Sequence, residues 1–290
     1  MNIAFFGLGN MGFPIAANLL KAGHCVTSAI HRNPAHTEKL KEIGGKVVSS
    51  PEEALKGAAV IFTIVPNDYE LENLMMKQSM LEAIEQGSII IDMTSASAGA
   101  VCMLSDYYRS KQVPVLDAPV SGGVKGASTA TMTMICAGDK SVYNQVLPLL
   151  KCISSTQLHI GSEIGLAKKM KSINNLMSSA NMAVMGEAWK IAANNGISPQ
   201  VFYDVISVSS GCSNSFKNGF PHIAENDYTA SFTTALMRKD VGLALELVTD
   251  EAVPIARIVY EYLKQASVYD NDDHSSVTRI NFKSEDTQKE

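Results

Sequence analysis

The sequence predicts an α/β protein: a Rossmann-type, doubly wound parallel sheet followed by an all-α C-terminal domain. Short, β-rich apolar runs alternate with helical stretches up to about residue 160, and right-handed crossovers turn this alternation into a parallel sheet. A glycine-rich segment joins the first run to the first helical stretch. Beyond Gly161 the apolar residues recur only at helical spacing, so the rest of the chain is predicted to be helical.

Six apolar runs in the first half have the length and composition of strands. Three segments between them show helical periodicity. Ligands of such a sheet bind beyond the carboxyl ends of its strands. The predicted strands are residues 3–6, 25–30, 60–65, 89–93, 115–118 and 132–137, and the predicted helices are residues 13–22, 69–84 and 98–111.

One long helix is predicted to open the second half, from about Leu166 to Asn194, because the apolar residues keep helical spacing throughout this segment. Gly196, followed by Pro199, is expected to end it. The polar tail after Asn281 is expected to fray. Further helices are predicted at residues 200–208, 236–249 and 254–265.

Composition limits the classes of protein to consider. At 290 residues the chain exceeds the usual size of one hydrophobic core. Hydrophobic residues make up 46% and charged residues 18%, as in packed globular proteins. The net charge of -5 makes nucleic acid and anionic membranes poor partners. No apolar run approaches the roughly 20 residues that span a bilayer, so no membrane partner is expected.

The five cysteines are odd in number and form no Cys-x-x-Cys pair, which indicates reduced thiols. The chain opens on a strand-like segment that leaves no room for a signal peptide. We therefore expect a cytoplasmic protein. No cluster of His, Cys, Asp or Glu has the spacing of a metal site, so no metal is expected.

The glycine-rich segment fits the G-x-G-x-x-G pattern between a strand and a helix, which predicts a dinucleotide site. Gly7 allows a tight turn, Gly9 lets the backbone approach the pyrophosphate, and Gly12 brings helix and strand together. The helix N-terminus offers free N–H groups and a positive dipole end to the phosphates. The predicted cofactor-binding residues of this loop are Gly7, Leu8, Gly9, Asn10, Met11 and Gly12.

The choice of cofactor depends on the residues at the end of the second strand, His31 and Arg32. An acidic residue there holds the ribose 2′-hydroxyl of NAD, whereas an arginine suits the 2′-phosphate of NADP. No carboxylate precedes Glu38. The sequence therefore predicts NADP, with NAD possible, and the alternative is that Arg32 is only a solvated surface residue.

The predicted domains are residues 1–162, which bind NAD(P), and residues 163–290, an all-α substrate and oligomerisation domain.

The motifs together resemble the β-hydroxyacid dehydrogenase family, which includes 3-hydroxyisobutyrate dehydrogenase and tartronate semialdehyde reductase. The resemblance covers nearly the whole chain, and it is specific because the blocks follow one another in the family's order. Residues 6–14 resemble the dinucleotide signature, 117–123 the substrate loop, 165–175 the catalytic helix and 236–242 a later cofactor-contacting helix, with a further match at 273–277.

The chain also departs from the family pattern in three places. The second strand is one residue longer before His31 and Arg32, Ala96 replaces the usual proline after Ser95, and Ala130 stands where glycine is common. These changes affect where the 2′-phosphate binds and which substrate the protein accepts.

The resemblance implies that Lys171 is the catalytic residue. Lys171 and Asn175 lie one turn apart on one face of a helix. A lysine can deliver a proton to a developing alkoxide, and Asn175 can hold the substrate oxygen. Without the resemblance, Lys168, Lys169 and Lys171 indicate a solvated helix face. Lys168 is expected to be dispensable for activity.

Ser121, Gly122 and Gly123 offer a hydroxyl and backbone N–H groups that suit a small carboxylate, and the alternative is a plain turn. The resemblance assigns further residues to the cofactor, although an ion pair with Asp240 is the alternative for the last of them. They are Val65, Pro66, Ser95 and Lys239.

The resemblance implies reversible hydride transfer between NADP(H) and a small 3-hydroxy acid or its semialdehyde, with Lys171 as general acid and base. It also implies a homodimer or homotetramer assembled through the α domain. An imine reductase on the same fold is one alternative, although there the catalytic lysine is typically replaced. The other alternative is a non-catalytic NADP-binding sensor or scaffold.

Overall fold

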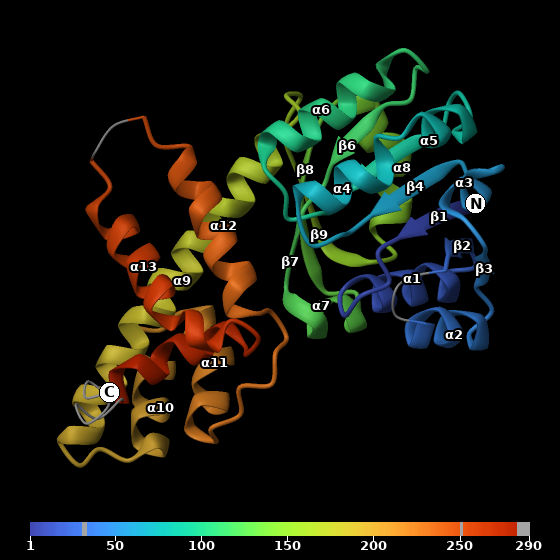
Figure 1. Ribbon diagram of the computed structural model, residues 1–290. Coiled ribbons are helices and arrows are strands. Elements are labelled where there is room, and N and C mark those ends of the chain that lie inside the picture. Colours follow the sequence, from blue (N-terminus) through green and yellow to red (C-terminus); the bar gives the residue numbers. More distant parts are fainter. Residues whose placement is uncertain (31–33, 250–251, 283–290) are drawn as a thin grey trace. The chain divides into compact units, whose positions relative to one another are not determined.

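The computed structural model describes residues 1–30, 34–249 and 252–282 (Figure 1). His31, Arg32 and the end of the polar tail lie outside the described residues. The chain divides into two compact units, Met1–Lys171 and Ser172–Glu290, and each has hydrophobic clusters of its own. The domain boundary after residue 162 stays a prediction.

Among the described residues, nine strands form one sheet in the first unit, in the order β3-β2-β1-β4-β5-β6-β8-β7 with β9 beside β8. The pairs from β3 to β6 are parallel. Strand β8 runs antiparallel to β6 and β7 and parallel to β9. The strands are β1 (Asn2–Phe6), β2 (Cys25–Ala29), β3 (Lys46–Val48), β4 (Val60–Thr63), β5 (Ile89–Asp92), β6 (Val115–Asp117), β7 (Val120–Ser121), β8 (Met132–Ala137) and β9 (Ser154–Gly161).

Side chains of β1 alternate between two hydrophobic clusters, one on each face of the sheet. Ile3 and Phe5 belong to one cluster, and Ala4 and Phe6 belong to the other, as the two-residue period of a strand requires. Helices α1 and α8 cover the first face, and α3 to α6 cover the second. Figure 1 shows α4, α5 and α6 together on one side of the sheet. The predicted doubly wound α/β fold is therefore confirmed.

In the first unit, helices alternate with the strands along the chain. Four helices begin at a side chain that accepts a hydrogen bond from the first turn: Ser50, Asn67, Ser97 and Asp139. The helices are α1 (Gly12–Lys21), α2 (Pro34–Glu42), α3 (Pro51–Leu55), α4 (Asp68–Met75), α5 (Gln78–Ala83), α6 (Ala98–Arg109), α7 (Gly123–Thr129) and α8 (Lys140–Leu150).

The prediction of a single helix at residues 69–84 is wrong, because the structure has two helices there, α4 and α5. They are separated at Met76 and Lys77, which has an extended backbone. Met75 and Met80 are both fully buried in the same cluster. On one continuous helix they would point about 140° apart. The break lets both side chains reach the core.

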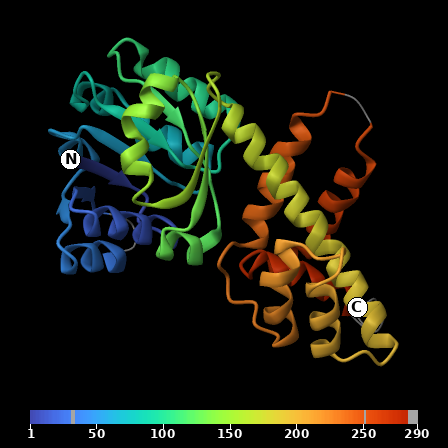
Figure 2. The same cartoon turned by 180° about the vertical axis from the view of Figure 1, so that it is seen from behind.

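The second unit is helical. The long helix α9 (Leu166–Asn194) has the predicted bounds, and Figure 2 shows it running without interruption. Its end is formed by Gly196 at a φ of +74°, with hydrogen bonds from the N–H of Gly196 and of Ile197 back to the last turn. The other elements are α10 (Pro199–Ser207), α11 (Asn214–Ala224), α12 (Thr234–Glu246), α13 (Pro254–Gln265) and the 3₁₀ helices η1 (Ala266–Tyr269) and η2 (His274–Phe282).

An aromatic cluster fills the core of the second unit. The rings of Phe202, Phe216 and Phe220 contact one another, and Trp189 of α9 packs against two of them. Such contacts hold α9, α10 and α11 together. Within the described part of the chain, no helix is both long enough and apolar enough to cross a membrane.

Candidate active site

The loop between β1 and α1 needs glycine at Gly7 and Gly12 for reasons within the chain itself. Gly7 has a φ of +102°, and a Cβ there would lie 1.9 Å from the carbonyl oxygen of Ile64. A Cβ on Gly12 would lie 1.8 Å from the carbonyl oxygen of Gly7. Real side chains do not tolerate either contact, so these two glycines close the turn and pack the helix on the strand.

Gly9 lies in a different environment, because a Cβ there would meet nothing within 4 Å. None of the described residues requires glycine at this position, whereas a pyrophosphate approaching the backbone does. Helix α1 also begins at Met11 without a side-chain cap, so its first N–H groups suit an anion. The loop therefore fits the dinucleotide that the motif predicts.

His36 of α2 holds this loop, and the sequence analysis did not identify it. Its ring Nδ1–H donates a 2.5 Å hydrogen bond to the carbonyl oxygen of Leu8, and the ring stacks on Phe13 at 5.6 Å. No local pattern marks His36, because its partners come from a different part of the chain. The roles of His31 and Arg32 stay predictions, because both residues lie outside the described range.

The other predicted cofactor residues of the first unit follow β4 and β5. Val65 and Pro66 follow β4, and Ser95 follows β5. Because β1, β4 and β5 are neighbours in the sheet, these residues emerge at the same edge as the glycine loop. The N–H of Val65 donates to the hydroxyl of Thr94 at 3.3 Å, which links the two segments.

The predicted substrate loop leaves β7 and enters α7. Gly122 and Gly123 have φ values of +132° and +61°, so the backbone conformation favours glycine at both positions. A Cβ on Gly123 would meet nothing within 4 Å, and Ser121 precedes both at the end of β7. Ala130, which ends α7, has a left-handed backbone, a conformation that favours glycine.

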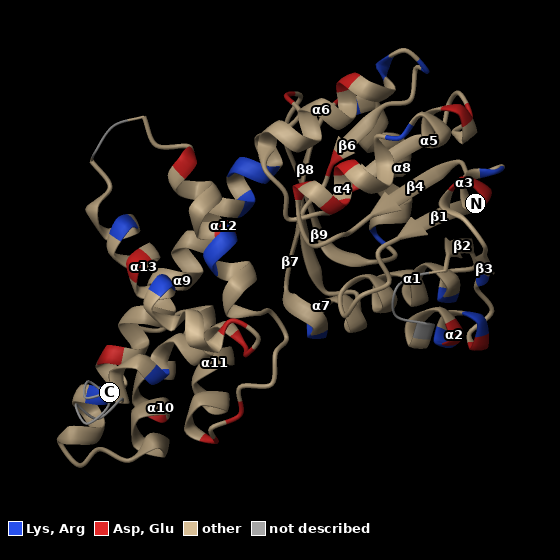
Figure 3. Ribbon diagram, in the orientation of Figure 1, with Lys and Arg blue, Asp and Glu red and all other residues tan. Residues whose placement is uncertain are grey.

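Lys168 forms a buried ion cluster with Asp92 and Asp117, so the expectation that it faces solvent is wrong. Its Nζ lies 2.9 Å from Asp92 Oδ2 and 3.2 Å from Asp117 Oδ1. The side chain of Lys168 is 1% exposed and those of the two aspartates are 0% exposed. Although Figure 3 shows basic residues gathered on the first turns of α9, helical spacing alone did not indicate which of them points inward.

Burial and the neighbouring charges shift the pKa values of this cluster in opposite directions. Burial lowers the pKa of Lys168, but the two carboxylates outweigh burial and raise it above the ordinary value. Burial raises the pKa of Asp117, and the nearby ammonium of Lys168 only partly offsets this. The aspartates therefore favour the ammonium form of Lys168.

Lys171 and Asn175 lie one turn apart on α9, as expected. Lys171 is half-buried and Asn175 is 4% exposed. Asn175 Nδ2 donates to Asp240 Oδ2 at 2.6 Å, and its Oδ1 accepts a 3.2 Å hydrogen bond from Asn174. These partners fix the direction of the amide and leave one of its two N–H groups for another acceptor.

Asp240 also pairs with Lys239, whose Nζ lies 3.0 Å from Asp240 Oδ1. The ion pair considered as the alternative role of Lys239 therefore exists. Asp240 is buried, with 2% of its surface exposed, and its carboxylate contacts both Lys239 and Asn175. In the sequence, Asp240 is evident only as a neighbour of Lys239, although it lies within the block that resembles the cofactor-contacting helix.

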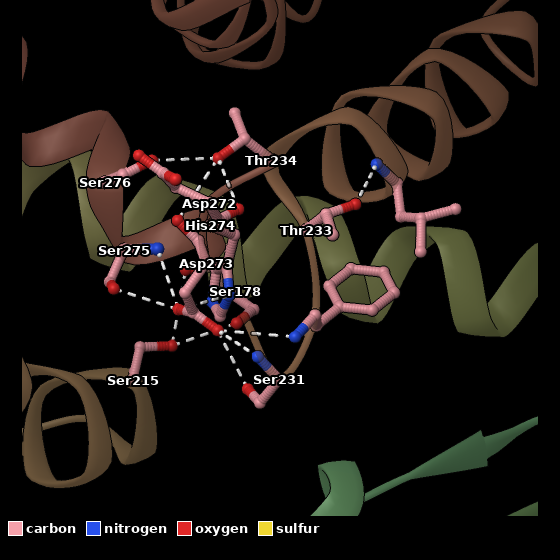
Figure 4. A network of polar contacts seen from close by, with 12 residues as sticks. Ser178, Ser215, Ser231, Thr233, Thr234, Asp272, Asp273, His274, Ser275 and Ser276 are labelled. Carbon is pink, nitrogen blue, oxygen red and sulfur yellow. Dashed lines mark hydrogen bonds and ion pairs between the residues drawn. The ribbon is translucent and has the colours of Figure 1, made fainter. Parts of the chain in front are cut away.

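A network of hydrogen bonds around Asp273 anchors the start of α12 (Figure 4). Asp273 accepts hydrogen bonds from the N–H and hydroxyl groups of Ser231 and Ser275, and it pairs with His274 at 3.3 Å. Burial raises the pKa of Asp273, but the hydrogen bonds and the charge of His274 outweigh it and hold the pKa well below its usual range. The block at residues 273–277 thus positions the helix that carries Lys239.

Among the residues that the structure describes, no group of three His, Cys, Asp or Glu side chains could hold a metal ion. The first unit instead offers a glycine loop for phosphates, a glycine-rich loop after β7 and lysines at the start of α9, and the second unit carries Lys239 on α12. The fold and these elements define a nicotinamide-dependent oxidoreductase.

Family models match both halves of the chain. Residues 2–161 match the NAD binding domain of 6-phosphogluconate dehydrogenase, and residues 165–280 match the NAD-binding domain of NADP-dependent 3-hydroxyisobutyrate dehydrogenase. The chain belongs to the β-hydroxyacid dehydrogenase family, which confirms the resemblance found in the sequence, and it is an NAD(P)-dependent dehydrogenase or reductase.

Curated relatives match over most of their length. The chain is 32% identical to 2-(hydroxymethyl)glutarate dehydrogenase of Eubacterium barkeri over 88% of this chain and 85% of that protein. It is 33% identical to mitochondrial 3-hydroxyisobutyrate dehydrogenase of Drosophila melanogaster over 88% and 80%.

Solved structures show the same fold. The 3-hydroxyisobutyrate dehydrogenase of Mycobacterium tuberculosis, solved with L-serine, is 31% identical with a TM-score of 0.85, covering 96% of this chain and 98% of that one. The imine reductase of Myxococcus stipitatus in complex with NADP+ is 16% identical with a TM-score of 0.68, covering 96% and 99%, and shares the fold alone.

Proposed function

We propose that this enzyme transfers hydride between NADP(H) and a small 3-hydroxy acid or its semialdehyde, with Lys171 as general acid and base. The observation that carries the proposal is the pairing of Lys171 with Asn175 on one face of α9, with the Asn175 amide held by Asp240. An ammonium beside an oriented amide suits an oxygen that gains negative charge during reduction.

The residues of this chain then have separate tasks. The bound nicotinamide supplies the hydride chemistry. The N–H groups of Gly122 and Gly123 and the hydroxyl of Ser121 hold the substrate carboxylate. Asn175 donates its remaining N–H to the substrate oxygen, and Lys171 Nζ gives that oxygen a proton in reduction and accepts it in oxidation.

The substrate class rests on chemistry shared with relatives. The names of the relatives include dehydrogenases of 3-hydroxyisobutyrate, 2-(hydroxymethyl)glutarate and L-threonate, all hydroxy acids, and L-serine in the Mycobacterium tuberculosis structure is itself a 3-hydroxy acid. Lys171 argues against the imine reductase alternative. The test is a spectrophotometric screen of short semialdehydes with NADPH or NADH and of 3-hydroxy acids with the oxidised cofactors. Activity on imines alone would contradict the proposal.

NADPH should bind more tightly than NADH, because Arg32 follows the second strand in the sequence and no carboxylate lies between it and Glu38. Arg32→Ala should remove most of that preference, by about 1 to 3 kcal/mol for a lost charge-assisted contact. Fluorescence titration with both cofactors measures the two affinities, with Lys39→Ala as the control on α2. Equal affinities in the unmodified enzyme would show that Arg32 is a surface residue.

We expect a homodimer or homotetramer, because α9 exposes an apolar stripe in the second unit. Ile173, Met177, Val184 and Ile191 are 40%, 63%, 67% and 65% exposed, and they recur at intervals that place them along one side of the helix. Light scattering at micromolar concentration measures the mass, and Val184→Asp should shift it towards the monomer. A monomeric mass for the unmodified chain would refute this expectation.

A further inference from the structure

The ion cluster of Lys168 joins three segments that the proposed function uses. Asp92 ends β5, Asp117 ends β6, and Lys168 lies in the first turn of α9. Besides its two ion pairs, Lys168 Nζ donates to the carbonyl oxygen of Asp92 at 2.9 Å. Asp117 Oδ2 accepts from the backbone N–H groups of Gly165, Ala167 and Lys168 at 3.0 to 3.3 Å.

Each member of the cluster directly precedes a segment of the site. The cofactor residue Ser95 follows Asp92, the substrate loop that ends at Gly123 follows Asp117, and Lys171 lies three residues after Lys168 on the same helix. Three residues correspond to about 4.5 Å along the helix axis. A shift of the first turn of α9 would therefore move Lys171 relative to both loops.

Stability alone does not explain a fully buried lysine at this position. Moving charges out of water is unfavourable, and apolar residues of similar volume are often as stable or more stable in a protein interior. The charges instead fix the relative positions of the groups that they join. Lys168 contacts both carboxylates at once, and Asp92 is further oriented by Thr63 Oγ1 at 2.7 Å, so the arrangement has one defined geometry.

We propose that Lys168 is a positioning residue for hydride transfer: its ammonium holds the first turn of α9, and with it Lys171, in register with the cofactor segment after β5 and the substrate loop after β6. The proposal rests on the proposed function for the role of Lys171. It assigns Lys168 no contact with substrate or cofactor.

The test is Lys168→Met in the full chain, which removes the charge and keeps most of the length of the side chain. Because a displacement of about 1 Å near the chemistry can cost about 10²-fold, kcat per NADPH-binding site should fall at least about 10-fold while the Kd for NADPH stays within about threefold. Hydrogen exchange should accelerate in peptides covering residues 92–97, 117–123 and 165–171, and not in peptides of α1.

Lys169→Met is the matched control. Lys169 is the next residue on the helix, and its ion pair at 3.2 Å is with the exposed Glu163. Its kcat should stay within about twofold of the unmodified enzyme, as expected for an exposed ion pair. A folded Lys168→Met enzyme with unchanged kcat and unchanged exchange would overturn the proposal.

If Lys168→Met does not fold, the double variant Lys168→Met with Asp117→Asn decides the matter. It removes one carboxylate together with the ammonium, and the side-chain oxygen of the new asparagine can still accept from the start of α9. It should fold, with kcat at least about fivefold lower because the link from α9 to Asp92 is gone. Normal kcat, or failure to fold, would overturn the proposal.

The two proposals can fail separately. If the unmodified enzyme turns over no 3-hydroxy acid or semialdehyde, the proposed function fails. The exchange comparison still decides whether Lys168 orders the three segments, because it needs no substrate.

Discussion

Replacing Lys171 by alanine should lower turnover by about 10²- to 10⁴-fold, the usual contribution of general acid catalysis. In the proposed reaction, negative charge develops on the substrate oxygen as hydride arrives, and the ammonium of Lys171 neutralises it by giving up a proton. Alanine leaves that oxygen without a donor. The glycine loop at Gly7, Gly9 and Gly12 lies in another part of the first unit, so the affinity for NADPH should change little.

Steady-state rates and an NADPH titration on the same preparation separate a chemical defect from a binding defect. Lys169→Ala is the appropriate control, since Lys169 pairs with the exposed Glu163. Lys168→Ala, which the sequence analysis expected to be harmless, is unsuitable because it would leave Asp92 and Asp117 buried without a cation. If Lys171→Ala retained near-normal turnover, the proposed mechanism would be wrong even though the fold is right.

Gly12→Ala and Gly9→Ala should both weaken NADPH binding, but only Gly12→Ala should destabilise the enzyme. The new Cβ at position 12 would lie 1.8 Å from the carbonyl oxygen of Gly7, so the loop must move, at a cost of about 1 to 3 kcal/mol in the free energy of unfolding. The new Cβ at position 9 would meet no atom of the described residues within 4 Å. It would only fill the space that the pyrophosphate needs.

Thermal unfolding without cofactor and fluorescence titration with NADPH distinguish the two variants. Gly12→Ala should lower the Tm and weaken NADPH binding, whereas Gly9→Ala should leave the Tm unchanged and weaken binding at least about 10-fold through the lost approach to the phosphates. Normal NADPH affinity in Gly9→Ala would mean that the cofactor does not pass over Gly9.

The strands that the sequence predicted are those buried on both faces. Strands β4 and β5 are wholly buried, and such strands appear as continuous apolar runs. Strands β3 and β7 are only three and two residues long, and β9 has many polar side chains and only one buried residue, Ser154. Their hydrogen-bonding partners in the sheet, rather than their composition, make them strands.

The sequence by itself determined the α/β fold, the glycine loop and the bounds of α9, because these depend on local periodicity and on residues near one another in the chain. Only the tertiary structure showed that Lys168 is buried, that Asp240 holds Asn175 and Lys239, and that His36 supports Leu8. Apart from the pair of Lys239 and Asp240, each of these contacts joins segments far apart in the chain. Helical spacing identifies which residues share a face, but the charges that meet that face come from strands and helices elsewhere in the sequence.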